Sequence, residues 1–169
     1  PTRRSSDLVR EATGQTIHGW LAPALTHTPR TLDLIAEYGL DYTCDLYHDD
    51  QPFPVKTATG DLISMPYSLE VNDHYGFFIY NMSPREYART LIRQFERLAD
   101  EPSGTVMCIP LHSYLIGQPH RIGVLLSDRV VRMVTEHAMA CRHEDDGLTL
   151  HGMRGGSVLQ RQWVCLGVQ

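Results

Sequence analysis

The chain has 169 residues, of which 42% are hydrophobic and 21% are charged, and its formal net charge is −5 at pH 7. These values fit one globular domain with a hydrophobic core. The acidic balance argues against a nucleic-acid-binding protein, and no apolar run approaches the roughly 18 residues of a membrane span. The four cysteines lie far apart in no disulfide or zinc-binding pattern. This favours a cytoplasmic location, although a signal peptide on a missing N-terminus stays open.

The first eight residues, PTRRSSDL, have no apolar period and no helix-capping pattern. They correspond to one reading frame of a common sequencing adapter, and the chain has no initiator methionine. We therefore expect residues 1–8 to be an adapter-derived or cloning artefact, and the chain to be the C-terminal part of a longer protein. A solvated basic terminus is the alternative, and under either interpretation residues 1–8 are set aside from the fold.

The first half of the remaining chain predicts one helix and three short strands. The helix begins at Thr28, which suits an N-cap, and ends at Gly39. A strand at 41–44 leads into an acidic, proline-containing loop at 45–54. Residues 55–65 predict a hairpin of two strands whose turn contains Thr-Gly-Asp.

The second half predicts two helices and a buried strand. Helix 84–99 is the clearest, since Ser83 and Glu86 form a capping box, and the arginines on its outer face indicate a solvated surface. Residues 105–111 are continuously apolar, as in a buried parallel strand, and apolar spacing predicts a further helix over 122–137. Strands alternating with helices predict an α/β fold with a parallel sheet.

The tail differs from the rest of the chain. From residue 138 the hydrophobic period is lost, so residues 138–169 form a separate, divergent segment. A frameshift near residue 138 and a naturally divergent terminus both account for this change.

Three short segments place polar residues beside a proline or after an apolar run, as loops that line a cleft do. They are Asp-Asp-Gln-Pro-Phe at 49–53, Pro-Tyr-Ser-Leu-Glu-Val-Asn-Asp at 66–73 and Pro-Leu-His at 110–112. With Gly-Trp-Leu-Ala-Pro at 19–23 upstream, they resemble the later motifs of the polysaccharide deacetylase (NodB-homology) family, and more closely its allantoinase-like, urate-catabolism branch. The resemblance implies that residues 9–137 form an incomplete (β/α) barrel of the deacetylase type, with the N-terminal strands missing.

The metal-binding motifs of that family are absent from this chain. The family holds a divalent cation with an early aspartate pair and a His-x-x-x-His pair. None of the nine histidines here stands four residues from another. We therefore expect no metal or other cofactor in this chain, while the resemblance implies a divalent metal such as zinc in the longer parent protein.

His112 is the first catalytic candidate. It follows the predicted strand 105–111, at the end where α/β proteins place functional groups. The resemblance implies that this histidine acts as a general acid toward the leaving nitrogen, and an imidazole suits that role. The alternative is a histidine that only caps the strand end.

The acidic loop supplies two further catalytic candidates, Asp49 and Asp50, and a substrate-binding candidate, Asp45. The resemblance places these residues in the family's fourth motif, where a carboxylate orients the catalytic residues or the substrate. The tryptophan that ends the common form of this motif is absent. A hydrated acidic loop without function is the alternative.

Trp20 is a substrate-binding candidate in the position of the family's third motif. That motif carries an arginine two residues before its proline, and this chain has Leu21 there. The departure argues against a standard metal-dependent deacetylase and favours the allantoinase-like branch. Packing in the core is an equally good interpretation of Trp20.

Glu70, Asn72 and Asp73 complete the substrate-binding candidates. A carboxamide beside a carboxylate offers the paired donors and acceptors that ureide and amide substrates need. An Asx turn is the alternative for the Asn-Asp pair. The aromatic residues of the loop at 71–80 would either wall the pocket or form an interface.

These observations predict a fragment of a hydrolase that acts on non-peptide C–N bonds, inactive alone, with a small-molecule ureide or an acetylated amino sugar as substrate. Neither nucleic acid nor membrane is expected as a partner, and homo-oligomerisation stays open. Two alternatives remain: a non-catalytic ligand-binding or interaction module of the same fold, and an unstable truncation whose unpaired sheet edges promote self-association.

Overall fold

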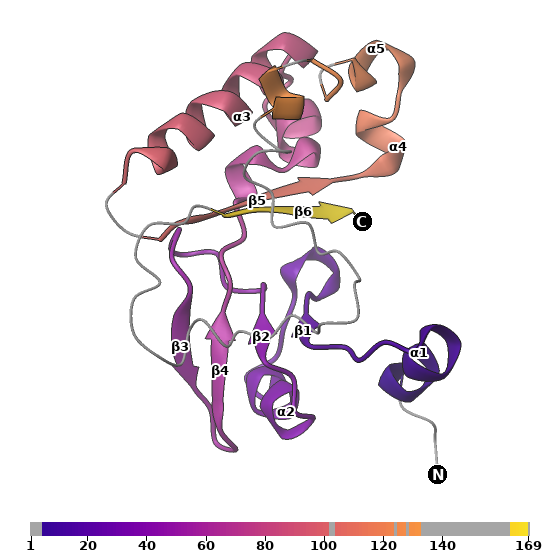
Figure 1. The fold of residues 1–169 in the computed structure, drawn as a ribbon, viewed down its shortest axis with the longest axis vertical. Coiled ribbons are helices and arrows are strands. Elements are labelled where there is room, and N and C mark those ends of the chain that lie inside the picture. Colours follow the sequence, from indigo (N-terminus) through magenta and orange to yellow (C-terminus); the bar gives the residue numbers. More distant parts are fainter. Residues whose placement is uncertain (1–4, 102–103, 124, 128, 133–162, 169) are drawn as a thin grey trace. The chain divides into compact units, whose positions relative to one another are not determined.

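The computed structural model of the protein has two compact units (Figure 1). It describes residues 5–101, 104–123, 125–127, 129–132 and 163–168. The first unit contains the described chain up to Leu46 together with Phe53–Met65, and the second contains Tyr47–Pro52 and the described residues from Pro66 onward. Among the described helices, none is long and apolar enough to cross a membrane.

The first unit is built on a four-stranded open sheet in the order β1-β2-β4-β3. The strands β1 (Gly19–Trp20), β2 (Tyr42–Thr43) and β4 (Asp61–Ser64) run parallel, and β3 (Phe53–Lys56) is antiparallel to β4. The hairpin predicted over 55–65 is therefore confirmed, with its first strand beginning at Phe53.

Two helices belong to the first unit, α1 (Ser5–Thr13) and α2 (Thr31–Glu37). The structure places Ser5–Leu8, part of the segment that was set aside, in α1. The second helix begins one turn later than predicted, because the Thr31 N–H closes a turn onto the Thr28 carbonyl at 3.0 Å. It ends at Glu37, and Gly39 follows the C-cap as the predicted stop, with a φ of 76° that suits glycine.

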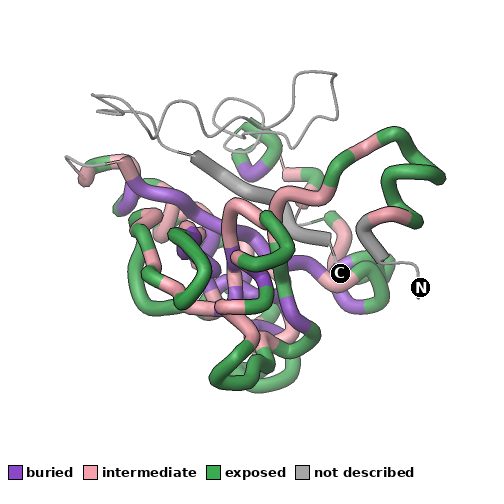
Figure 2. The backbone as a smooth tube through the Cα atoms, turned by 90° about the horizontal axis from the view of Figure 1, so that it is seen from below, coloured by how far each residue is buried: buried purple, intermediate pink, exposed green. Residues whose placement is uncertain are grey.

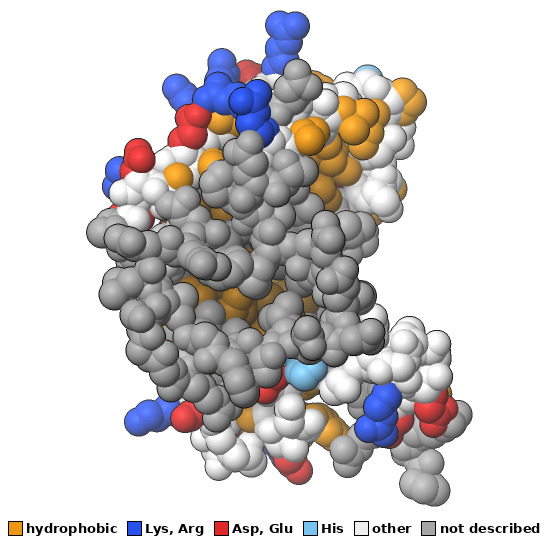
Figure 3. Space-filling model, in the orientation of Figure 1, with side chains coloured by type: hydrophobic (Ala, Val, Ile, Leu, Met, Phe, Trp, Pro, Cys, Tyr) orange, Lys and Arg blue, Asp and Glu red, His pale blue; other side chains and the backbone are white. Residues whose placement is uncertain are grey.

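The long helix of the second unit, α3 (Pro84–Ala99), matches its prediction in extent and capping. The Ser83 hydroxyl accepts a hydrogen bond from the Glu86 N–H, and the Glu86 carboxylate accepts one from the Ser83 N–H. Its arginine face is solvated, as predicted (Figure 3). The arginines on this face, all exposed, are Arg85, Arg89, Arg93 and Arg97.

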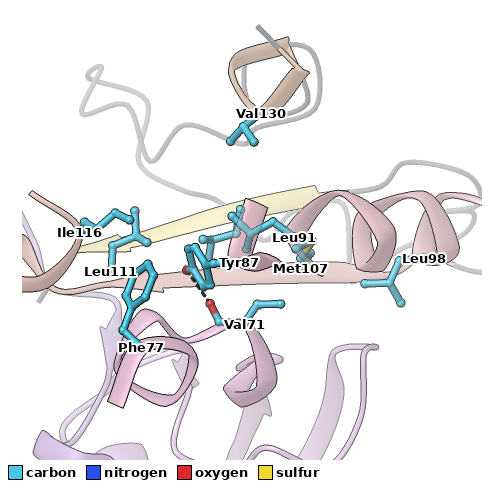
Figure 4. Packing of buried hydrophobic residues seen from close by; sticks show 10 residues of the cluster. Val71, Phe77, Tyr87, Leu91, Leu98, Met107, Leu111, Ile116 and Val130 are labelled. Carbon is cyan, nitrogen blue, oxygen red and sulfur yellow. Dashed lines mark hydrogen bonds between the residues drawn. The ribbon is translucent and has the colours of Figure 1, made fainter. Parts of the chain in front are cut away.

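The core of the second unit forms around β5 (Val106–Leu111), a strand in which every residue is buried, and which pairs in parallel with β6 (Trp163–Val168). Figure 2 shows continuous buried stretches of backbone beside exposed turns. Tyr87 crosses this core and donates its hydroxyl to the Val71 carbonyl at 2.8 Å (Figure 4). The other buried members are Phe77, Leu91, Leu98, Met107, Ile109, Leu111, Ile116 and Val130. The predicted strand 105–111 is confirmed.

Two predictions for the second unit are wrong. The segment predicted as an aromatic loop at 71–80 instead contains η3 (Tyr75–Ile79), a π-helical turn that follows the short 3-10 turn η2 (Leu69–Val71). Its formation depends on tertiary packing, because Phe77 is buried against Tyr87 at a ring-centroid distance of 4.9 Å.

The helix predicted over 122–137 is wrong at its start, although residues 129–132 within it are helical. Ile122 instead ends α5 (Pro119–Ile122), which follows α4 (Ser113–Ile116). Gly117 ends α4 and Pro119 occupies the first turn of α5. Residues 133–137 lie outside the described chain. Together the two units confirm a mixed α/β fold with open sheets.

Candidate functional site

His112 stands where β5 ends and α4 begins. The continuous apolar run of β5 fixes the strand in the core, and His112 leaves it in extended conformation as the residue preceding α4. Its side chain keeps 14% of its surface exposed. The imidazole is therefore held by the core while one edge stays accessible.

Asp73 binds His112 through both carboxylate oxygens. Oδ2 accepts the backbone N–H of His112 at 2.9 Å, and Oδ1 lies 2.6 Å from the imidazole Nδ1. The Asp73 side chain is fully buried. An ionised carboxylate can only accept, so Nδ1 carries the hydrogen and Nε2 is left for another partner. Within the described chain, Nε2 has no hydrogen-bond partner.

Asn72 fixes the turn that carries Asp73. Its side-chain oxygen accepts the N–H of His74 at 2.8 Å, and its Nδ2 donates to the Tyr67 hydroxyl at 2.8 Å. This is the Asx-turn geometry that was the alternative to substrate binding. Asn72 is itself buried, so most of its polar capacity serves the turn.

Tyr67 supports Asn72 from a buried position, with 6% of its surface exposed. Burial raises the pKa of its hydroxyl to about 12, and the hydrogen bond from Asn72 opposes part of this rise. Tyr67 is therefore a neutral hydroxyl at physiological pH, and it accepts the Asn72 hydrogen bond without introducing a charge beside Asp73.

Two aromatic rings lie beside the His112 imidazole. Its ring centroid lies 5.7 Å from that of His74 and 5.5 Å from that of Tyr114, and His74 also meets Phe78 edge-on at 5.2 Å. Sequence reasoning missed His74 and Tyr114. Tyr114 stands two residues after His112 and His74 directly follows Asp73 in the sequence, which gave a weak signal, but their ring positions depend on η3 and α4.

The acidic loop does not reach His112, which corrects the expectation that it orients this residue. The Asp50 carbonyl accepts the N–H of Val106 at 2.8 Å, which places the loop at the amino end of β5. The extended backbone from Val106 to His112 spans about 20 Å at about 3.3 Å per residue. The carboxylate beside His112 is Asp73, so neither catalytic candidate in this loop, Asp49 or Asp50, has direct access to the imidazole.

The carboxylates near the amino end of β5 act on one another instead. Partial desolvation and the negative charges of Glu70, Asp49 and Glu101 raise the pKa of Asp50. The Asp49 Oδ1 accepts the N–H of Gln51 at 3.1 Å, a local turn contact. Glu70 is exposed and accepts a hydrogen bond from Gln94 of α3. This geometry matches the hydrated acidic loop that was the alternative interpretation.

Asp45 and Trp20 lie together in the first unit. The buried Asp45 carboxylate accepts the Trp20 indole N–H at 2.9 Å and the Ala22 N–H at 2.7 Å. These bonds secure the turn after β1, where Ala24 and Leu25 both have a φ of 54°. Left-handed backbone is costly for such residues, so Asp45 stabilises a strained turn. Trp20 is 38% exposed and keeps part of its ring surface free for contact.

The described residues do not fit a resident metal ion. Among them, no group of three or more His, Cys, Asp or Glu side chains is placed to hold one. Asp73 uses both of its oxygens on His112.

No protein-family model matches the chain, and no curated protein matches it at a significant level. Solved structures do match. PuuE allantoinase has 29% sequence identity and a TM-score of 0.63, and the match covers 78% of this chain and 44% of that one. A probable polysaccharide deacetylase from Pseudomonas aeruginosa PAO1 has 28% identity and a TM-score of 0.64, and the match covers 78% of this chain and 45% of that one. The resemblance inferred from the motifs is therefore confirmed in structure, and the chain spans under half the length of either protein.

Proposed function

We propose that this partial structural relative of PuuE allantoinase and polysaccharide deacetylases carries the proton-donating part of a hydrolase of non-peptide C–N bonds. One observation carries the proposal: the His112 imidazole, at the end of β5, has its Nδ1 bound by the buried Asp73 carboxylate and its Nε2 left for a substrate. We further propose that the two open sheets belong to a (β/α) barrel of the deacetylase type.

The role of His112 follows from the chemistry of the leaving group. When an amide or ureide C–N bond breaks, the departing nitrogen is a poor leaving group unless it is protonated. Protonated His112 would donate its Nε2 hydrogen to that nitrogen. Asp73 would hold the ring in the correct orientation and compensate its positive charge.

The substrate class and the cofactor are parts of the same proposal. A ureide such as allantoin and an acetylated amino sugar both present a carbonyl carbon bonded to nitrogen. The two similar structures are named an allantoinase and a probable polysaccharide deacetylase, which supports this choice of substrates. A divalent metal such as zinc, if the complete enzyme uses one, would be held by residues other than those described here. It would polarise the carbonyl and activate water.

A hydrolysis assay tests this proposal. Because this chain is expected to be inactive alone, the longer protein that contains it is assayed on allantoin and on acetylated amino-sugar oligomers, with and without chelator. His112→Ala is assayed beside His120→Ala, a matched control at an exposed residue of α5. We expect loss of hydrolysis in His112→Ala and none in His120→Ala. Chelator sensitivity would indicate a metal. A folded longer protein that hydrolyses neither substrate, or a fully active His112→Ala, would contradict the proposal.

One observation favours a second candidate, a non-catalytic binding or interaction module. Large apolar residues of η3 and α4 are strongly exposed, with Phe78 at 58%, Ile79 at 60% and Tyr114 at 59%. Exposed aromatic residues of this kind often contact a partner, including a second copy of the same chain. Ligand binding or homo-oligomerisation by a folded protein without hydrolysis would favour this candidate.

A further inference from the structure

We infer that His74 is a second substrate-contacting residue, placed to accept a proton from the water that attacks the carbonyl. This inference deepens the proposed function and rests on it. His74 has no counterpart among the motif residues that suggested the site. The inference about His74 comes from the ring geometry around His112.

The position of His74 is fixed from both its backbone and its ring. The Asn72 side chain accepts the His74 N–H, and η3 begins at the next residue. The imidazole packs edge-on against Phe78 at 5.2 Å and against Tyr75 at 6.2 Å between ring centroids. The contacts with Phe78 and Tyr75 hold the His74 ring in one orientation.

The polar atoms of His74 are available. Its residue is only partly buried, and within the described chain its ring nitrogens have no hydrogen-bond partner. His18 and His112, by contrast, each place Nδ1 against a carboxylate. Without such a partner, the neutral His74 ring offers both a donor and an acceptor.

The distance between the two imidazoles suits one shared ligand. Their centroids are 5.7 Å apart and their planes are tilted by 51°. The reacting end of an amide or ureide, with its carbonyl carbon bonded to nitrogen, is small enough to contact both rings at hydrogen-bond distance. Neither ring needs to move far from its packed position.

Hydrolysis gives the two rings complementary roles. The attacking water transfers a proton to a His74 nitrogen while its oxygen bonds to the carbonyl carbon. The C–N bond then breaks, and the nitrogen takes the Nε2 proton of His112. His74 leaves the step protonated and His112 neutral, and exchange with solvent restores both. Atoms and charge balance without an oxidant or reductant.

The test follows the imidazole carbon–hydrogen signals of the full chain by NMR during titration with allantoin and with N-acetylglucosamine. We expect the His74 and His112 signals to shift together along one binding curve, while the His120 signal stays in place. His74→Phe, which keeps a ring against Phe78 but lacks the nitrogens, should weaken binding by about 2- to 10-fold, the scale of one hydrogen bond. It should also lower hydrolysis by about 100-fold or more. His120→Phe is the matched control.

The outcomes separate this inference from the proposed function. If His112 shifts and His74 does not, or if the longer protein with His74→Phe is folded and hydrolyses like the unmodified protein, His74 is a packing residue. The inference then fails, while the role of His112 stands. If neither ring responds to either probe, the proposed function fails and the inference fails with it. The signals of the unmodified chain decide the point even if His74→Phe does not fold.

Discussion

The two ends of β5 hold charged side chains in opposite ways. After the carboxyl end, Asp73 is fully buried and gives both oxygens to His112. At the amino end, Asp50 lies among carboxylates, and partial desolvation together with the charges of Glu70, Asp49 and Glu101 raises its pKa. One end pairs a buried carboxylate with a histidine, and the other gathers several carboxylates that raise the pKa of one of their number.

The difference shows what makes a cluster of polar residues a candidate site. Adjacent carboxylates in the sequence looked like a catalytic motif, yet their exposure lets water screen their charges, and Asp49 makes a local turn contact with Gln51. Asp73 is a single carboxylate, but its burial forces it to be satisfied by specific donors. Those donors belong to His112, so the hydrogen bonds that satisfy buried Asp73 also position the imidazole.

The largest expected effect comes from Asp73→Asn, which removes the carboxylate that pairs with His112 after the carboxyl end of β5. The amide oxygen can still accept the His112 N–H, but the amide NH₂ would face Nδ1 and make it an acceptor. We expect the ring to switch to the Nε2–H tautomer, visible in its nitrogen chemical shifts, and hydrolysis to fall by about 100-fold or more. An unchanged tautomer would show that Asp73 does not set the state of His112.

Gly76→Ala tests whether the close packing of η3 against Tyr87 stabilises the fold near the carboxyl end of β5. A Cβ added at Gly76 would lie 2.9 Å from Cδ2 of Tyr87, closer than normal packing allows. The buried Tyr87 ring has little room to move, so we expect a loss of about 1–3 kcal/mol in the free energy of unfolding. Denaturant unfolding measures this loss, with Gly60→Ala as a control, since a Cβ there meets nothing within 4 Å.

Tyr67→Phe removes the acceptor beneath Asn72 and should cost about 1 kcal/mol at neutral pH. It also has a pH signature. The hydroxyl titrates near pH 12 in the folded chain and near 10 when unfolded. The folded state therefore holds the proton longer, and this contribution is complete below pH 10 and is lost as the pH rises toward 12. The variant should show a flatter loss of stability over that range, and an identical slope would contradict this account of Tyr67.

The smallest effect is expected from Asp50→Asn at the acidic end. Because desolvation and neighbouring charges raise the folded pKa of Asp50, its contribution to stability is present at low pH and is lost as the pH rises through that value. The substitution should change the free energy of unfolding by less than about 0.5 kcal/mol at neutral pH. The His112 tautomer should be unaffected. A change in that tautomer would contradict the separation of the two ends.

Local sequence determined the elements whose signals are complete within a few residues. The capping box at Ser83 and Glu86 set the start of α3, Gly39 set the end of α2, and the apolar run of β5 predicted a buried strand. In each case the deciding interaction is made by neighbours in the chain or by uniform burial, so pattern alone is enough. The motifs also pointed to His112 and to the solved structures that resemble this chain.

Tertiary structure alone decided which carboxylate meets His112. Asp73 is 39 residues away in sequence, and no local pattern distinguishes it from Asp49 or Asp50. The turn at Asn72, the π-helical turn η3 and the burial of Phe77 against Tyr87 together place Asp73 and His74 beside the end of β5. These positions depend on packing between distant segments, and a long-range contact of this kind leaves no periodicity for sequence reasoning to detect.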